Sequence, residues 1–463
     1  MTTATKYKTY PKYKPSGIDW LGDIPDNWET NRLRYFFDYH AGGVWGDEEK
    51  GDQNDLICLR VADFDFDHFG LSNNDLTNRN IPENQHSRIL EKGDILLEKS
   101  GGGEKQTVGR AVRFDSNDRA VCSNFIEKLT PHKIHNSKYI SYLMGALYYG
   151  TINVRSIKQT TGIQNLDIYA YFCEVVPFPE KSIQQSIADF LDRETAKIDE
   201  MVAKKKKLIE LLREKRQALI THAVTKGLSS FAKTSADKDP KAKMKPSGID
   251  WLGDIPEGWE AEYMKNIGCF TSSGIDKKIV EGEPLVQMVN YTDIYGNEAR
   301  VVNKNRDLMT VSCPAWKIQE SNLIKGDLVF TPSSETTEDI GLSALIDDDL
   351  INTVFSYHVI RFRFSEDFDH DFKKYWCNNS FVWQQFSSLA KGTTRQILDR
   401  NDFKNIFVVI PPKTEQQSIA DFLDRETAKI DEMVKKTELQ IEKLQEYRQA
   451  LITSAVTGKI MVN

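Results

Sequence analysis

The sequence predicts an α+β protein: two mixed α/β domains separated by a long antiparallel two-helix coiled coil, arranged as an internal pseudo-two-fold repeat. Three observations support this fold class. Two sequence blocks recur in the same register along the chain. Each copy ends in a long stretch that contains neither proline nor glycine. Between the repeated blocks lie two dissimilar segments that mix alternating apolar runs with helical patterns.

The repeated blocks establish a tandem duplication. QQSIADFLDRETAKIDEMV occurs from Gln184 to Val202 and again from Gln416 to Val434. KPSGIDWLGDIP occurs from Lys14 to Pro25 and again from Lys245 to Pro256. The two offsets, 231 and 232 residues, agree to within one position. Two long identities in one register indicate a frame that is built twice and carries two unlike inserts.

Length and composition indicate a globular protein. At 463 residues, with 28% charged and 40% hydrophobic side chains, the chain is long enough for several domains. It lacks the apolar stretch of roughly 18 residues that a membrane span needs, and its start lacks the apolar core of a signal peptide. The six cysteines form no CxxC pair, so we expect reduced thiols, no zinc and a cytoplasmic protein without membrane contact. The net charge of −7 argues only weakly against nucleic acid, because local charge decides binding.

Two long helices are predicted at 181–226 and 413–458. Both stretches are rich in helix-forming residues, and their apolar residues are spaced by three, four or seven, as in a coiled coil. The apolar positions are Leu191, Ile198, Val202, Ile209, Leu212 and Leu219, repeated as Leu423, Ile430, Val434, Ile441, Leu444 and Leu451. Fused duplicates mimic a two-fold dimer, so we expect antiparallel pairing with the two inserts at opposite ends. The alternative is that each helix docks separately on its own domain.

The remaining chain divides into two domains and two connecting pieces. We expect domains at 1–180 and 245–412, a flexible linker at 227–244 and a short C-terminal tail at 459–463. The linker is polar and lysine-rich. Both domains combine strand-like runs, such as Ala111–Phe114 and His358–Phe364, with helical pieces, such as Ser137–Gly150.

A glycine-rich loop, KSGGGEKQTVGR, spans Lys99 to Arg110 after the strand-like run Asp94–Glu98. Consecutive glycines allow a ligand close to the backbone, and the basic and amide side chains supply donors. A nucleotide-binding P-loop is excluded by spacing, because Gly103 is followed by Glu104 and not by lysine and a hydroxyl residue. Contact with nucleic acid and a plain structural turn remain as alternatives.

A second polar loop, KQTTGIQNL, spans Lys158 to Leu166, and KGTTRQIL at Lys391–Leu398 occupies the same register in the other domain. Glutamine and asparagine pair with adenine in the major groove, and lysine and arginine pair with guanine. The counterpart of the glycine loop is TPSSETTED at Thr331–Asp339, which follows Leu328–Phe330. Its hydroxyls and carboxylates replace lysines, so two base-reading loops of this kind would read different bases. Solvated surface is the alternative.

These loops supply the candidate DNA-binding residues of both domains. In the first domain they are Lys99, Ser100, Gly101, Gly102, Lys105, Gln106, Arg110, Lys158, Gln159 and Gln164. In the second they are Ser333, Ser334, Thr336, Lys391, Thr393, Arg395 and Gln396.

Catalytic motifs do not emerge from the sequence. The eight histidines lack metal-ligand spacing, and neither HExxH nor GxSxG occurs. The Asn or Asp, Pro, Pro, aromatic motif of amino-methyltransferases is also missing. We therefore expect a binding protein that is not an enzyme and holds no metal.

The repeated blocks resemble those of specificity subunits of type I restriction–modification enzymes. The resemblance rests on YKPSGIDWLGDIPDNW (Tyr13–Trp28), its copy KPSGIDWLGDIPEGW (Lys245–Trp259) and QQSIADFLDRETAKID. That last block follows VVPFP (Val175–Pro179) in one half and VVIPP (Val408–Pro412) in the other, so the likeness covers nearly the whole chain.

The resemblance implies two target recognition domains, 1–180 and 245–412, joined by two spacer helices. Each domain would recognise one half of a bipartite, asymmetric double-stranded DNA site, while the helices fix the gap. Two modification subunits would use S-adenosylmethionine to methylate adenine, which is flipped into their own pocket. Restriction subunits, which are motor nucleases, would join and use ATP and magnesium. By this likeness the chain itself holds no cofactor.

Two other classes of function compete with this hypothesis. A structural adaptor would carry two protein-binding domains on a coiled coil, consistent with the acidic net charge. An ATPase would use the SGGG loop, Ser100–Gly103.

Overall fold

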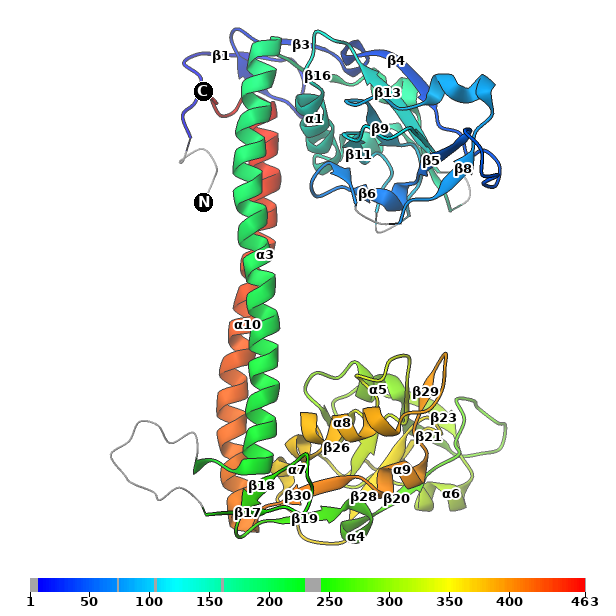
Figure 1. Ribbon diagram of the computed structural model, residues 1–463, viewed down its shortest axis with the longest axis vertical. Helices are drawn as coiled ribbons and strands as arrows, with labels where there is room; N and C mark the ends of the chain where they lie inside the picture. The colour runs from blue at the N-terminus through cyan, green and yellow to red at the C-terminus, as the bar shows by residue number, and fades with distance from the viewer. Residues whose placement is uncertain (1–6, 73–74, 104–105, 160–161, 230–242, 463) are drawn as a thin grey trace. The chain divides into compact units, whose positions relative to one another are not determined.

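The computed structural model describes residues 7–462 except 73–74, 104–105, 160–161 and 230–242. These residues form two compact units, one of Met1–Lys206 with Glu438–Asn463 and the other of Lys207–Thr437. The division cuts both long helices, α3 (Lys181–Lys226) and α10 (Lys413–Val456). Each unit therefore contains one mixed α/β domain and a part of each helix (Figure 1).

The two helices pack antiparallel within each unit, as predicted. In the first unit Arg448 Nε of α10 donates to Asp199 Oδ1 of α3 at 2.9 Å. In the second unit Arg216 Nε of α3 donates to Asp431 Oδ1 of α10 at 2.9 Å. Early residues of one helix thus meet late residues of the other in both units. The alternative in which each helix docks alone is wrong.

The first domain is built on two sheets and one covering helix. A four-stranded antiparallel sheet has the order β11-β9-β13-β4, and a three-stranded sheet has the order β12-β5-β8. Helix α1 contacts β11 of the larger sheet. The elements are β4 (Phe37–Gly42), β5 (Asp55–Leu59), β8 (Asn78–Asn80), β9 (Ile95–Glu98), β11 (Ala111–Arg113), β12 (Ala120–Cys122), β13 (Ile126–Pro131) and α1 (Ser137–Tyr149).

The second domain has the same plan with different strands. Its larger sheet has the order β20-β28-β24-β26-β22, and its smaller sheet has the order β23-β21-β27. Helices α7 and α8 belong to its apolar core. The elements are β20 (Gly268–Ser272), β21 (Leu285–Val289), β22 (Val301–Val302), β23 (Met309–Ser312), β24 (Leu328–Phe330), β26 (Ser343–Ile346), β27 (Thr353–Phe355), β28 (Ile360–Phe364), α7 (His370–Trp376) and α8 (Ser380–Leu389).

The repeated sequence blocks form matching structures in the two units. KPSGIDWLGDIP folds into a hairpin both times, β1 (Tyr13–Pro15) with β2 (Asp23–Pro25) and β17 (Met244–Pro246) with β18 (Asp254–Pro256). Each hairpin receives a lysine from the end of a long helix or just beyond it: Lys459 Nζ donates to Leu21 O at 2.8 Å, and Lys226 Nζ donates to Leu252 O at 2.7 Å. The internal repeat is therefore structural as well as sequential.

A buried glutamine ties each domain to the start of its helix. Gln184 accepts a hydrogen bond from the Asn136 N–H at 2.9 Å and donates to Pro179 O at 2.8 Å. Its counterpart Gln416 accepts from the Asp369 N–H at 2.8 Å. Gln416 also donates to Pro411 O at 2.9 Å.

A tyrosine on the first covering helix adds a second tie in each unit. The Tyr142 hydroxyl donates to Asp192 Oδ1 at 2.9 Å, and the Tyr375 hydroxyl donates to Asp424 Oδ1 at 2.6 Å. Both aspartates, like both glutamines, lie in the repeated nineteen-residue block. The identity of that block is thus explained in part by the joint that it forms twice.

In the part of the chain that the structure describes, no helix is long and apolar enough to cross a membrane. The six cysteines are all free thiols.

We expect Gln184→Ala to destabilise the first unit, because it removes the partners of the part-buried Asn136 N–H and of the buried Pro179 carbonyl. The loss should be about 1–3 kcal/mol in free energy of unfolding, measured by urea denaturation. Gln185→Ala is the matched control, because Gln185 is the next residue of the helix and is exposed. Equal stability of the two variants would contradict the role given to Gln184.

Candidate nucleic-acid interface

The two candidate loops of the first domain form one small sheet. β10 (Ser100–Gly101) pairs with β15 (Gln164–Leu166), which pairs on its other side with β14 (Ile157–Gln159). Ser100 lies opposite Asn165, and its hydroxyl donates to Asn165 Oδ1 at 2.6 Å. The structure therefore brings together two loops that the sequence singled out independently.

The candidate loops of the second domain pair in the same way. β25 (Ser333–Ser334) pairs antiparallel with β29 (Gln396–Ile397). Lys391 forms a further β-bridge with Ile397. The second domain thus repeats the loop arrangement of the first although the sequences differ.

Backbone hydrogen bonds show that the two arrangements are equivalent position by position. The Leu166 N–H donates to Lys99 O at 2.8 Å, and the Leu398 N–H donates to Pro332 O at 2.8 Å. The same backbone geometry therefore presents different side chains in the two domains.

One equivalent pair shows how far the chemistry diverges. The Glu98 N–H donates to Arg110 O at 2.8 Å, and the Thr331 N–H donates to Leu342 O at 2.9 Å. In the first domain these positions form a buried ion pair, with Arg110 Nε 2.9 Å from Glu98 Oε2. In the second domain a hydroxyl and an aliphatic side chain replace the charges.

Both candidate lysines are held by aspartates at the start of short helices. Lys158 Nζ lies 2.6 Å from Asp167 Oδ2, and Lys391 Nζ lies 3.1 Å from Asp402 Oδ1. The hydrogen bond from Lys158 lowers the pKa of Asp167. The lysine side chains remain 73% and 67% exposed, so a phosphate could replace either carboxylate.

The glycines close the first loop on itself. Gly102 has φ +62°, and a Cβ there would lie 2.9 Å from Gln106 O and 3.0 Å from Gln164 Oε1. Gly103 and Gln106 exchange backbone hydrogen bonds at 2.8 and 3.2 Å. The glycine run therefore makes a tight turn beside a buried glutamine. Lys105, a predicted contact, lies outside the described residues.

Lys99, at the start of the glycine-rich loop, is held by an ion pair. Its Nζ lies 2.8 Å from Glu127 Oε2, and His40 Nδ1 lies 2.8 Å from Glu127 Oε1. The Glu127 side chain is almost fully buried. The predicted donor Lys99 thus neutralises a buried carboxylate in the free protein.

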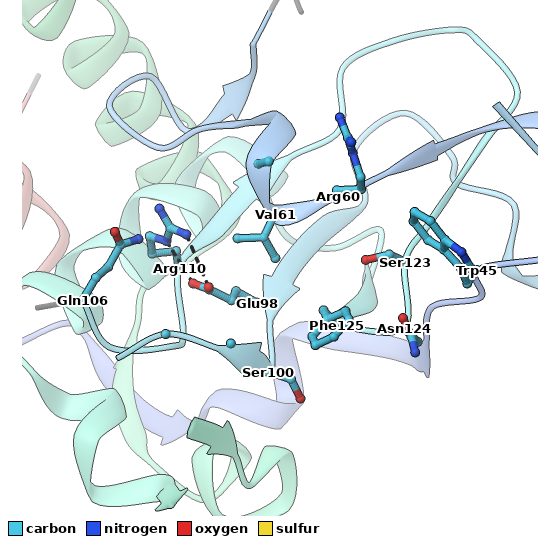
Figure 2. Close-up of a pocket in the computed structure, with 13 residues that line it drawn as sticks. Trp45, Arg60, Val61, Glu98, Ser100, Gln106, Arg110, Ser123, Asn124 and Phe125 are labelled. Atoms are coloured by element: carbon cyan, nitrogen blue, oxygen red, sulfur yellow. Dashed lines mark hydrogen bonds and ion pairs between the residues drawn. The ribbon is translucent and has the colours of Figure 1, made fainter. Parts of the chain in front are cut away.

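A cavity of about 730 Å³ opens beside the first loop (Figure 2). The Glu98–Arg110 ion pair lies at its wall, as Figure 2 shows. Gln106, in the amide orientation that satisfies both groups, accepts from Arg110 Nε at 2.8 Å. The lining residues are Trp45, Arg60, Val61, Ala62, Glu98, Ser100, Gly101, Gly102, Gln106, Arg110, Ser123, Asn124 and Phe125.

Sequence reasoning missed the aromatic part of this wall. Trp45 and Phe125 are 39% and 46% exposed, and the Arg79 guanidinium lies 4.8 Å from the Trp45 ring centroid. Trp45 follows Val44, and Phe125 precedes Ile126, so each has an apolar neighbour in the sequence. Their exposure follows from tertiary packing, and the sequence holds no clear signal for it.

The second domain presents an arginine and hydroxyls. Arg395 Nε donates to Ser333 Oγ at 3.2 Å, and its guanidinium lies 5.8 Å from the Tyr291 ring centroid. Gln396 Nε2 donates to the Gly392 carbonyl at 3.0 Å, and Thr393 is exposed. Arg395 and Thr393 are therefore exposed to solvent, whereas Ser333 is buried and accepts a hydrogen bond from Arg395.

Asp339 organises the hydroxyl loop. Thr336 Oγ1 donates to Asp339 Oδ1 at 2.6 Å, and the hydroxyls of Ser334 and Tyr295 also donate to this carboxylate. Burial opposes ionisation of Asp339, but these hydrogen bonds outweigh it and lower its pKa. The hydrogen bond to Asp339, and then the negative charge of that carboxylate, raise the pKa of Tyr295 to about 12.

Among the residues whose placement is described, no group of three or more His, Cys, Asp or Glu side chains could hold a metal ion.

Sequence comparison connects this arrangement to known proteins. The family described as type I restriction modification DNA specificity domain matches residues 25–211 and 292–443. The EcoKI specificity subunit of Escherichia coli K12 is 21% identical over 384 residues, covering 82% of this chain and 78% of that protein. The MjaVIII specificity subunit of Methanocaldococcus jannaschii is 23% identical over 457 residues, covering 95% and 94%.

Structure comparison agrees on the fold. A chain from a structure titled for complex assembly and conformational transition of the type I R-M system has a TM-score of 0.60 and 13% identity, covering 94% of this chain and 98% of its own length. The family match covers most of the sequence. The chain therefore belongs to the family of type I restriction–modification specificity subunits, the non-catalytic DNA-recognition subunits of these systems.

Proposed function

We propose that each mixed domain of this chain recognises one half of a bipartite, asymmetric double-stranded DNA site. One observation supports this most directly. An equivalent pair of strands is built twice, β10 with β15 and β25 with β29, and the two pairs carry unlike polar side chains. A frame of constant geometry with variable side chains is suited to reading two different short sequences.

The exposed members of the first loop pair are the proposed DNA contacts. Gln106, Lys158 and Gln159 are accessible donors, and Lys158 would exchange its aspartate for a phosphate. Lys99 and Gln164 are buried or anchored, so we assign them to support of the loop. The remaining candidates are also assigned to support and not to DNA contact. They shape the loop and the cavity wall: Ser100, Gly101, Gly102 and Arg110.

In the second domain Arg395, Thr393, Lys391 and Thr336 are the proposed contacts. Arginine pairs bidentately with guanine, whereas hydroxyls accept from and donate to several bases. Ser333, which donates nothing to DNA in this proposal, accepts a hydrogen bond from Arg395 and orients its guanidinium. The two half-sites would therefore differ in sequence.

The duplicated helix surface is proposed to recruit two modification subunits. Met201 and Met433 occupy equivalent positions of the repeated block and are both 43% exposed. Lys197 and Lys429 also match, each lying 2.8 Å from the glutamate three residues before it. A surface present twice on one chain suits two copies of one partner.

The cofactors then reside on the partners. The modification subunits would supply S-adenosylmethionine and the pocket for a flipped adenine. Restriction subunits would add ATP and magnesium. The helix pair would fix the unread gap, because an α-helix is stiff and rises 1.5 Å per residue.

Arg395→Ala should weaken binding of the reconstituted complex to DNA by about 1–3 kcal/mol, because one hydrogen-bond donor to a base of the second half-site is lost. Binding of the reconstituted complex to duplexes with single base changes measures this effect. Arg400→Ala is the control, being an exposed arginine of the same domain outside the loop pair. An equal loss in both variants would show that Arg395 contributes only charge.

Met201→Glu should remove one modification subunit from the complex, and adding Met433→Glu should remove the second, because a charge would be buried in each interface. Native mass spectrometry of the complex counts the subunits. Leu208→Glu is the control, since Leu208 is 45% exposed on α3 but lies outside the repeated block. Unchanged stoichiometry in the double variant would reject this docking surface.

A heptad inserted into both α3 and α10 should lengthen the gap by about three base pairs, since seven residues add roughly 10.5 Å and a base pair about 3.4 Å. Both half-sites should stay the same. The same seven residues placed between 230 and 242, outside either helix, form the control. A gap unchanged by the paired insertion, or altered half-sites, would refute the role of the helices as a spacer.

A further inference from the structure

Two equivalent residues in the two domains share an unusual backbone conformation. Phe69 has φ +54° and Arg300 has φ +55°. Their carbonyls occupy matching places: Phe69 O accepts from the Arg113 N–H at 2.8 Å, and Arg300 O accepts from the Leu345 N–H at 2.9 Å. A left-handed conformation is strained for such side chains and persists where the surroundings enforce it. Its occurrence at the same place in two unlike domains indicates a shared task.

The side chain of Phe69 packs where the first domain meets the long helices. It is 5% exposed and lies edge-on to Tyr142 at 5.3 Å between ring centroids. A Cβ added at Gly145 of α1 would lie 2.2 Å from the Phe69 ring, so only glycine leaves room for it. The Arg448 guanidinium of α10 lies 5.6 Å from the ring centroid.

The ring of Phe69 thereby packs against the ion pair that joins the two helices. Arg448 Nε and Nη2 donate to Asp199 at 2.9 and 3.4 Å. The Arg448 side chain is only 8% exposed. His68, the neighbour of Phe69, has its Nε2 atom 3.7 Å from Asp199 Oδ2. The hairpin of β6 (Phe64–Asp65) and β7 (Gly70–Leu71), which carries His68 and Phe69 between its strands, thus contacts both partners of the cross-helix ion pair.

The second unit has the same ion pair with a weaker cover. Arg216 lies 2.9 Å from Asp431, with side chains 30% and 47% exposed. Burial, and then the charge of Arg216, lower the pKa of Arg300. At this position the second unit therefore carries a charged side chain, where the first carries an apolar ring.

We propose that Phe69 is a positioning residue that fixes the orientation of the first domain on its helix pair and so restricts the gap length that the protein accepts. This inference rests on the proposed function. Phe69 belongs to neither strand of the reading pair, so its loss would leave the base contacts in place. It would instead open space between α1, the hairpin and Arg448, and let the domain rock on the helices.

The test compares gap preference in three variants of the full chain assembled with its modification subunits. The substrates are duplexes that carry both half-sites at the cognate gap or at gaps one base pair shorter or longer. Phe69→Ala removes the ring, and Phe69→Leu keeps part of it. Phe114→Ala is the matched control, because Phe114 is 2% exposed in a core cluster that contains no residue of either long helix.

The expected result is a fall of about tenfold in the ratio of cognate-gap to altered-gap methylation for Phe69→Ala, since a looser joint broadens the separations that bind both halves at once. Phe69→Leu should show a smaller fall in the same direction and decides the question if Phe69→Ala fails to assemble. Phe114→Ala should keep the wild-type ratio despite lower stability.

An unchanged ratio in the assembled Phe69 variants, or an equal fall in Phe114→Ala, would overturn the inference. Both results leave the proposed function standing, because half-site preference is scored separately, on duplexes with the cognate gap and one base changed in either half-site. A wild-type complex with no half-site preference would instead overturn the proposed function and this inference with it.

Discussion

The architecture of each unit depends on one buried glutamine at the start of a long helix. Gln184 and Gln416 each satisfy a backbone N–H of the domain and a backbone carbonyl of the proline-containing segment just before the helix. A buried amide that is hydrogen-bonded through both its oxygen and its nitrogen tolerates little rotation, because rotation breaks these bonds. The domain is therefore attached to its helix at a defined angle.

This constraint explains the uneven pattern of identity along the chain. The block that must satisfy the joint is the same in both copies, whereas the inserts share only a backbone plan. Backbone hydrogen bonds maintain the frame at Glu98 and Thr331 alike, and the side chains are free to differ. An ion pair with Arg110 in one domain and an aliphatic neighbour in the other are equally compatible with the same strand pairing. New specificities can then arise without rebuilding the joint.

The two long helices could be predicted from the sequence, because their apolar spacing is a local pattern. The spacing of Leu191, Ile198 and Val202 predicted the helix, and the duplication predicted its antiparallel partner. The pairing of β10 with β15 was beyond such reasoning, because it joins strands more than sixty residues apart that are only two or three residues long. Each loop could be recognised as polar, but its own sequence does not indicate which strand it pairs with.

Among the candidate site residues, the structure shows local partners that sequence reasoning did not predict. It proposed Lys158 and Lys391 as donors to DNA, and the structure pairs both with aspartates that only the fold brings near. It also omitted Trp45 and Phe125, since exposure of an aromatic depends on tertiary packing.

We propose, in sum, that one duplicated frame carries two independent readers. Replacing the second insert, 258–412, by a copy of the first, 27–180, tests it most directly, with methylated adenines mapped genome-wide. The account predicts methylation at an inverted repeat of the first half-site across an unchanged gap. A direct repeat, or the original asymmetric site, would contradict it.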